Sequence, residues 1–190
     1  TEYSIDSISD FSSPTTQPTP REARMTMRPI FLSFISCYPI AMKIVAQRVK
    51  EARVIVAEKR ISEIRAGLLL FLGIEKGDTE SNAVSGVKKI SGLRLFEDDQ
   101  GKMNLSNEEM EGSFLVVSQF TLCANLSKGK RPGFDRAMKP PESERLYRLF
   151  CQHLETSTGR PVLQGQFGAH MEVELVNDGP ATFLLEFPAD

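Results

Sequence analysis

Two short polar segments carry the residue types in this chain that could do chemistry. The first reads Ser-Gln-Phe-Thr-Leu at residues 118–122 and follows the apolar run 114–117 without a break. Side chains at the end of a strand are held by the sheet yet face a loop, which suits a binding site. A plain strand end, with its hydroxyl groups bonded to neighbouring backbone, fits the same residues, and the pattern alone favours that plainer interpretation.

The second segment reads Asn-Asp-Gly-Pro-Ala-Thr at residues 177–182. Asn, Asp, Gly and Pro all favour tight turns, so this segment by itself predicts a turn between two strands. Spacing alone makes neither segment specific for one reaction.

Other nucleophiles, bases and metal ligands are scarce. The sequence contains no G-x-S-x-G, H-E-x-x-H, P-loop or G-x-G-x-x-G motif. His153 falls on the apolar stripe of an expected helix, His170 at the start of an expected strand and Cys123 after a strand end, and packing is the plainer role for each. Two histidines and three scattered cysteines favour neither a Cys/His metal site nor a disulfide framework. We therefore expect no metal and no cofactor.

Length and composition indicate one soluble globular domain. The chain has 190 residues, of which 41% are hydrophobic and 25% charged, enough to build a core. A net charge of -2 argues against a protein that coats nucleic acid through a broad positive field, so any contact with RNA must be local. No apolar run is long enough to span a membrane.

Periodicity predicts an α+β fold with a largely antiparallel sheet. Short β-branched or continuous apolar runs and alternating patterns predict strands, and spacings of three and four residues predict two helices. The expected strands cover 43–49, 53–56, 61–64, 68–72, 114–117, 171–175 and 183–187, and the expected helices cover about 79–94 and 142–156.

The first 41 residues differ from the rest of the chain. Residues 1–20 are rich in Ser, Thr and Pro, which is typical of disorder, and Arg21, Arg24 and Arg28 precede the apolar run 30–35, as in a targeting segment. An untranslated upstream stretch, a targeting segment and a disordered tail all fit. Patterned sequence begins at Met42, so we expect an extension over 1–41 and a catalytic domain over 42–190.

The sequence from Met42 to Phe187 resembles the D-aminoacyl-tRNA deacylase family. Members carry an S-Q-F-T-L segment and an N-x-G-P-x-T segment, and both are present here in that order. The opening run 42–49 and the segments 72–78, 93–96, 101–104 and 167–169 also match. Gly133 departs from the family pattern, where a serine is expected.

This resemblance implies the fold, activity and partners of the family. It implies a small barrel-like or roll core with two helices packed outside, and a cytoplasmic homodimer whose active sites lie at the interface. It implies a cis Gly179-Pro180 peptide, supplied to the pocket of the other copy, as the filter that rejects L-aminoacyl-tRNA while D-amino acids and glycine are removed. Asn177 and Thr182 belong to the same substrate-binding segment. The terminal adenosine of tRNA is implied to bind near Ser118–Leu122.

The chemistry expected of such a site is ester hydrolysis by a positioned water molecule. Ser118, Gln119, Phe120 and Thr121 would form the catalytic segment, with backbone N–H groups of Phe120 and Thr121 stabilising the oxyanion. Thr121 could be the nucleophile, but no histidine lies in either motif to activate it, so we expect it to orient water.

The basic segment after the first motif is expected to contact tRNA phosphates through Lys128, Lys130 and Arg131, with Arg136 and Lys139 nearby. A solvated charged surface explains this segment equally well. A non-catalytic RNA-binding module and a general esterase remain as alternative functions.

Overall fold

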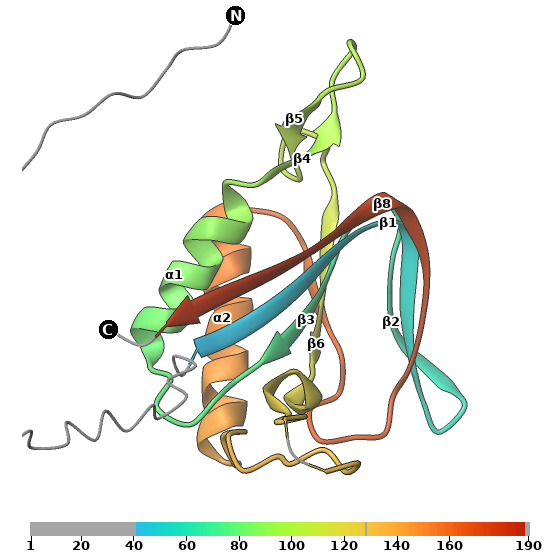
Figure 1. Ribbon diagram of the computed structural model, residues 1–190. Coiled ribbons are helices and arrows are strands. Elements are labelled where there is room, and N and C mark those ends of the chain that lie inside the picture. The colour runs from blue at the N-terminus through green and yellow to red at the C-terminus, as the bar shows by residue number, and fades with distance from the viewer. Residues whose placement is uncertain (1–40, 128, 189–190) are drawn as a thin grey trace, which may run out of the picture. The chain divides into compact units, whose positions relative to one another are not determined.

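The structure is a computed structural model that describes residues 41–127 and 129–188 (Figure 1). The expected extension over 1–41 lies outside the described residues except for Ala41, which begins the first strand. The described strands are β1 (Ala41–Val56), β2 (Lys59–Ile64), β3 (Gly67–Gly73), β4 (Arg94–Glu97), β5 (Met103–Ser106), β6 (Ser113–Ser118), β7 (Val162–Gln164) and β8 (Glu172–Pro188). The helices are α1 (Glu80–Ser91), the 3-10 turn η1 (Phe120–Cys123) and α2 (Glu142–Thr158).

Six of these strands form one mixed sheet in the order β2-β1-β3-β6-β7, with β8 paired to β1 on its other edge. β1 is antiparallel to β2, β3 and β8, whereas the β3–β6 and β6–β7 pairs are parallel. β2 also packs near β6 and β7, so the sheet curves until it nearly closes into a barrel. The α+β class and the barrel-like core are confirmed, and β4 and β5 form a separate hairpin.

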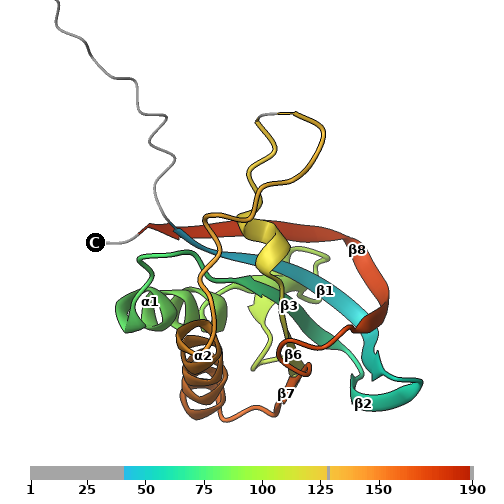
Figure 2. The same cartoon turned by 90° about the horizontal axis from the view of Figure 1, so that it is seen from below.

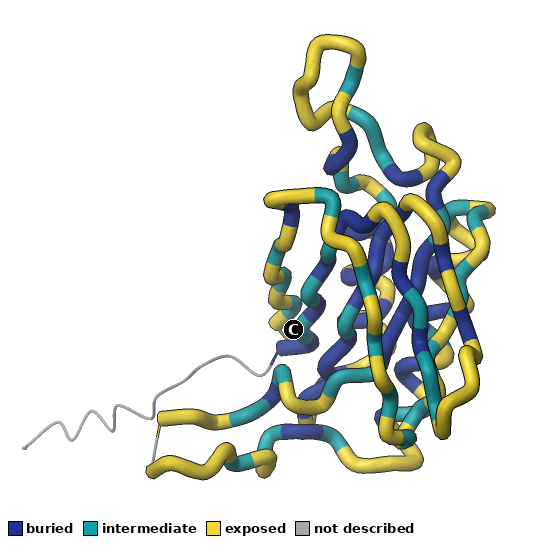
Figure 3. The backbone as a smooth tube through the Cα atoms, turned by 90° about the vertical axis from the view of Figure 1, so that its right-hand side faces the viewer, coloured by how far each residue is buried: buried dark blue, intermediate teal, exposed yellow. Residues whose placement is uncertain are grey.

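β3 and β6 are buried on both faces, which explains their unbroken apolar sequences. Leu68, Leu70 and Leu72 point towards the helices, while Leu69 lies in the second core cluster inside the curved sheet. β6 alternates in the same way, since Val116 lies in the core cluster between the sheet and the helices, together with Leu68, Leu70 and Leu72. Figure 3 shows the buried positions concentrated along these central strands and the exposed ones in the loops.

α1 and α2 lie together against one face of the sheet, as Figures 1 and 2 show. The two helices pack closely because Gly86 faces the partner helix: an added Cβ there would lie 3.2 Å from the Phe150 ring and 3.3 Å from Ile44. On α2, Leu146, Phe150 and Leu154 are buried at the expected spacing. The helix ends at Gly159, which adopts the left-handed conformation that glycine favours.

Several expected boundaries were wrong for identifiable reasons. The runs 43–49 and 53–56 form one strand, because β8 pairs with β1 across the polar residues between them. Arg94 belongs to β4 rather than to the first helix, which ends at Ser91. The expected turn at 177–180 is instead an irregular stretch within β8, where the register against β1 shifts twice.

The junction between β3 and α1 contains the acidic residue Asp78, which is buried. One carboxylate oxygen of Asp78 accepts the backbone N–H of Glu75 at 2.7 Å, and Thr79 then caps α1 through Asn82. Burial raises the pKa of Asp78 to about 6, an effect that the charge of nearby Glu75 reinforces and the N–H of Glu75 partly opposes.

We predict that Asp78→Asn stabilises the protein more at about pH 7.5 than at about pH 4. Because the pKa of Asp78 is raised on folding, the wild type loses stability as the pH rises from about 4 through 6, when the buried carboxyl must ionise. Asn keeps an acceptor for the N–H of Glu75 but has no proton to lose. Urea denaturation at both pH values should give a difference of up to about 3 kcal/mol in the free energy of unfolding.

The control is Asp98→Asn, since backbone N–H groups of Lys102 and Gln100 lower the pKa of that exposed carboxyl. Because a carboxyl with a lowered pKa titrates mainly below pH 4, Asp98→Asn should hardly change the difference in stability between the two pH values. Identical pH profiles for Asp78→Asn and the wild type would show that Asp78 does not titrate as described.

Candidate functional site

The Ser118–Leu122 motif does not continue as a strand but bends into the turn η1. Ser118 is the last residue of β6 and pairs with Leu72. The N–H of Gln119 then donates to the carbonyl oxygen of Leu72 at 2.8 Å, after which the chain turns. The turn lies directly on Gly73, where an added Cβ would be 2.8 Å from Cβ of Leu122.

The turn presents its polar groups to the outside. The Gln119 side-chain amide donates to Oγ1 of Thr121, and both Phe120 and Thr121 are exposed. The first N–H groups of a helical turn have no acceptor within it. In this turn they belong to Phe120 and Thr121. The N–H of Gln119 donates to Leu72 outside the turn, and the N–H of Leu122 makes the first bond within it, to the carbonyl oxygen of Gln119.

A cavity of about 330 Å³ opens beside this turn. Phe120 and Phe134 meet at its edge, with ring centroids 5.0 Å apart and planes at 66°. The floor is apolar, which is typical of ligand pockets of this volume. The lining residues are Leu72, Ile74, Ser118, Gln119, Phe120, Phe134, Ala137, Met138, Lys139, Pro140, Ser143, Phe167 and Gly168. Thr121 is not among them.

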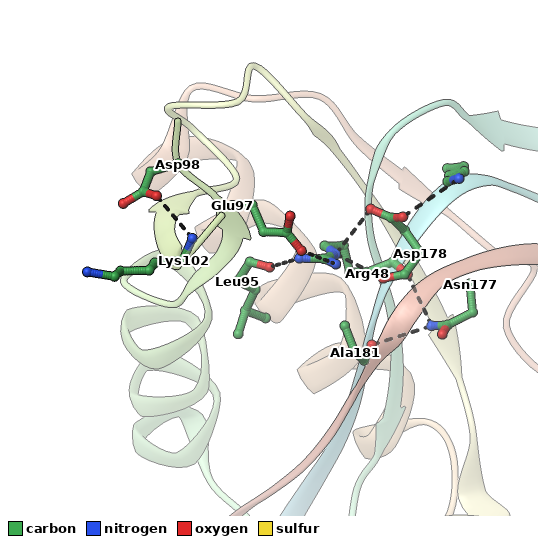
Figure 4. Close-up of polar contacts among 9 residues, drawn as sticks. Arg48, Leu95, Glu97, Asp98, Lys102, Asn177, Asp178 and Ala181 are labelled. Carbon is green, nitrogen blue, oxygen red and sulfur yellow. Dashed lines mark hydrogen bonds and ion pairs between the residues drawn. The ribbon is translucent and has the colours of Figure 1, made fainter. Parts of the chain in front are cut away.

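The second motif is held by Arg48 of β1, which is only 6% exposed. Figure 4 shows its guanidinium between Asp178 on one side and Leu95 and Glu97 on the other. Nε donates to the carbonyl oxygen of Asp178 at 2.9 Å and lies 3.1 Å from its carboxylate. Nη1 donates to the carbonyl oxygen of Leu95 at 2.6 Å, so this irregular stretch of β8 is fixed to both β1 and the β4–β5 hairpin.

Side-chain contacts within the motif complete this arrangement. Nδ2 of Asn177 donates to the carbonyl oxygens of Arg48 at 3.1 Å and Ala181 at 3.4 Å. Thr182 accepts a hydrogen bond from Gln47 at 3.1 Å. Between them, Gly179 and Pro180 are exposed and joined by a cis peptide bond, which confirms the isomer expected from the resemblance. A second cis bond, Pro140-Pro141, was not expected.

The two motifs lie at opposite ends of the same stretch of sheet. Ser118 is level with Leu72, which pairs with Ile44, whereas Asp178 is bonded to Arg48. Four residues of β1 separate these levels, or about 13 Å at roughly 3.3 Å per residue. One chain therefore does not bring Gly179-Pro180 to its own η1 turn.

The basic residues of the long loop after η1 have different surroundings. Lys130 and Arg131 are exposed, and the loop extends away from the sheet in Figure 2. Lys128 lies outside the described residues. Arg136 instead donates to the buried carboxylate of Glu75 at 2.7 Å, so its charge is committed within the protein.

The remaining candidates have the following positions. His153 is exposed rather than at the edge of the core, because the helix turns it away from the sheet. Cys123 is buried, and burial raises the pKa of its thiol to about 12, which makes it a poor nucleophile. His170 is exposed beside a second cavity of about 190 Å³, which shares Ser118, Gln119 and Phe120 with the first.

Sequence reasoning missed two buried charged residues, Arg48, which holds the second motif, and Glu75, which pairs with Arg136. Each is a single charged residue beside an apolar run, and such a pattern does not reveal that the side chain is buried and paired. Among the described residues, no group of three or more His, Cys, Asp or Glu side chains could hold a metal ion. No helix in the described part of the chain is long and apolar enough to cross a membrane.

We predict that Gly73→Ala lowers the free energy of unfolding by about 1–3 kcal/mol. The new methyl group would meet Leu122 at 2.8 Å and the carbonyl oxygen of Gln119 at 3.1 Å, so η1 must shift. Gly92→Ala is the matched control, because a Cβ there comes no closer than 3.5 Å to another atom. Equal urea midpoints for Gly73→Ala and Gly92→Ala would contradict the close contact between β3 and η1.

Comparison with known proteins gives a consistent result. A sequence model of the family described as D-Tyr-tRNA(Tyr) deacylase matches residues 45–186. A D-aminoacyl-tRNA deacylase of Geobacter sulfurreducens is 55% identical over 145 residues, which cover 76% of this chain and 95% of the relative. One of Thermotoga petrophila is 50% identical, covering 76% of this chain and 97% of its own.

Solved structures are similar over the same region. A protein described as c-Myc DNA Unwinding Element Binding Protein is 41% identical, with a TM-score of 0.73 over 77% of this chain and 99% of the other. A probable eukaryotic D-amino acid tRNA deacylase is 17% identical with a TM-score of 0.67, covering 77% of this chain and 99% of its own, and supports the fold alone.

Proposed function

Because the chain belongs to the D-Tyr-tRNA(Tyr) deacylase family, we propose that it is a hydrolase that removes D-amino acids, and mischarged glycine, from tRNA. The observation that carries this proposal is the η1 turn, whose exposed residues Phe120 and Thr121 lie at or beside an apolar cavity of about 330 Å³. Such a site supplies oxyanion donors next to a pocket for the end of the substrate.

The cavity suits the terminal adenosine of tRNA. Its walls are apolar and aromatic, with Phe120, Phe134 and Phe167 available for contact with a base. Lys139 also lines it and would favour a nearby phosphate. An adenosine seated there would place its ribose ester beside the turn.

Hydrolysis at this turn requires little from protein side chains. The ester is already activated, so donors for the developing oxyanion and a positioned water molecule supply most of what the reaction needs. The hydrogen-bond partner of Thr121 is the amide of Gln119, which is not a base and cannot activate a threonine nucleophile. Thr121 would therefore orient water, and the neighbouring ribose hydroxyl group could assist at high effective molarity.

Selection between enantiomers would come from the Gly179-Pro180 backbone. Carbonyl groups of this segment would hold the substrate α-amino group, while the turn holds the ester. With both groups fixed, one remaining position on the α-carbon opens to space and accepts a D side chain. The other position faces the backbone, where an L side chain would clash. Glycine has no side chain, so the filter would not reject it. Gly179 has no room for a side chain, since a Cβ would lie 2.1 Å from Oδ1 of Asn177.

This arrangement requires a second copy of the chain. One chain holds its two motifs about 13 Å apart along β1, so the filter would reach the turn of a partner in a homodimer. The face of the sheet opposite the helices offers an apolar row for such contact, from Phe71 through Val45 to Leu184, which pair in register. Leu184 is 63% exposed.

The remaining assignments concern the rest of the chain. Lys130 and Arg131, with Lys128, would contact acceptor-stem phosphates. Residues 1–41 would be an extension without a role in catalysis, and a tRNA substrate would place the protein in the cytoplasm. The alternative is nucleic-acid binding without catalysis, which the similarity to the c-Myc DNA Unwinding Element Binding Protein favours.

We predict that the protein hydrolyses D-tyrosyl-tRNA and glycyl-tRNA at least about 100-fold faster than L-tyrosyl-tRNA. A substituent on the α-carbon that clashes with a rigid backbone raises the free energy of the transition state by several kcal/mol. Each increase of about 1.4 kcal/mol slows the reaction tenfold. Release of labelled amino acid from each charged tRNA measures the three rates. The same assay on the chain starting at Met42 tests whether residues 1–41 are dispensable.

The outcomes separate the candidate functions. Equal rates on the two tyrosyl enantiomers would refute the chiral filter. Rapid cleavage of amino-acid esters that lack RNA would indicate a general esterase, and binding of tRNA without release of amino acid would indicate the non-catalytic alternative.

We predict that two inactive variants restore activity when mixed. Gly179→Ala disrupts the filter, and the double variant Gln119→Ala/Thr121→Ala disrupts the turn. In a heterodimer, one of the two sites would combine an intact turn with an intact filter, so co-refolding should recover about a quarter of wild-type activity.

Sedimentation velocity on the same samples establishes the oligomeric state. An active monomer at assay concentration, or no recovery in a sample that contains heterodimers, would contradict a site shared between two copies.

A further inference from the structure

A buried carboxylate lies behind the proposed site, outside both motifs. Glu75 follows the end of β3, and its side chain is fully buried. Nζ of Lys43 lies 3.1 Å from one oxygen, and Arg136 donates to the other at 2.7 Å. The backbone N–H of Ala41 also approaches this second oxygen at 3.3 Å. Burying a carboxylate with two cationic partners carries a large desolvation penalty. Glu75 is therefore a candidate for a functional role.

One partner of Glu75 contacts the turn. Nζ of Lys43 donates to the carbonyl oxygen of Leu122 at 3.4 Å, which is the last residue of the Ser118–Leu122 motif. The other end of the motif is fixed by the backbone bond from Gln119 to Leu72. Lys43 therefore gives the turn its second attachment to the sheet, and Glu75 holds Lys43 in place.

The other partner of Glu75 anchors the opposite wall of the cavity. Arg136 belongs to the loop that supplies Phe134, Ala137 and Met138 to the cavity lining. The loop is also fixed through its backbone, since the N–H of Lys76 donates to the carbonyl oxygen of Arg136 at 2.8 Å. Glu75 thus lies between the two segments that flank the cavity.

We propose that Glu75 is a positioning residue for the deacylation reaction, which holds the η1 turn through Lys43 and the adenosine-binding wall through Arg136. This inference rests on the proposed function. The two contacts serve different parts of the reaction: the turn carries the oxyanion donors, whereas the wall contributes to binding of the tRNA end. Loss of the Lys43 contact and loss of the Arg136 contact should therefore change different kinetic constants.

Three variants test this division in the full-length protein with D-tyrosyl-tRNA. Lys43→Met releases the carbonyl oxygen of Leu122 and should lower kcat about 10- to 100-fold with little change in KM, since small misplacement of reacting groups has effects of this size. Arg136→Met should raise KM with kcat nearly unchanged. Glu75→Gln, which preserves shape but removes the charge, should produce both effects.

Glu144→Gln serves as the matched control. This half-buried carboxylate on α2 is paired with Arg148 at 2.6 Å and does not line the cavity beside η1, so the kcat and KM of this variant should equal those of the wild type.

The double variant Glu75→Gln/Lys43→Met separates positioning from general stability. Removing Lys43 as well takes away the more buried of the two cations that lose Glu75, so the melting temperature should partly recover relative to Glu75→Gln alone. Because nothing then holds the carbonyl oxygen of Leu122, kcat should remain low. A double variant that regains wild-type kcat along with its melting temperature would overturn the positioning role.

Other outcomes are equally informative. Wild-type kcat and KM in Glu75→Gln would also overturn the inference. If that variant does not fold, Lys43→Met and Arg136→Met decide the question, and both must show the predicted division between kcat and KM. A wild-type protein without deacylase activity would refute the proposed function instead, and the two failures are thereby distinguished.

Discussion

The pairing of β1 with β3 is the interaction on which the rest of the site depends. Seven consecutive residue pairs, from Lys43–Gly73 to Val49–Gly67, fix these strands in register. The η1 turn packs on Gly73 at one end of this strand pair. At the other end, Arg48 holds the Gly179-Pro180 segment through Asp178. The distance between the two motifs is therefore set by a rigid element rather than by loops.

This rigidity has a consequence for catalysis. Chiral selection by exclusion works only if the excluding backbone cannot move aside, because a small displacement would admit an L side chain. Arg48 satisfies the requirement with bonds to Asp178 and Leu95 from a buried position. We propose that Glu75 plays the corresponding part at the other end of the strand pair, through its ion pair with Lys43. Buried charges thus hold two segments that, in the proposed mechanism, would act largely through the main chain.

The sequence predicted the elements that depend on local pattern and missed those that depend on tertiary contact. The apolar runs of β3 and β6 and the spacing of Leu146, Phe150 and Leu154 in α2 identified strands and a helix correctly. The bend at Phe120 was not predicted, because it depends on the absence of a side chain at Gly73, forty-seven residues earlier in the chain. The motif residues were found through family resemblance, whereas spacing alone favoured a plain strand end and a plain turn.

A structure of the protein bound to a non-hydrolysable D-aminoacyl-adenosine amide tests the central claim most directly. The adenosine should occupy the cavity beside Phe120, and the α-amino group should contact the Gly179-Pro180 carbonyl groups of a second copy. A ligand bound entirely by one chain, or an α-amino group away from that segment, would contradict a site shared across two copies.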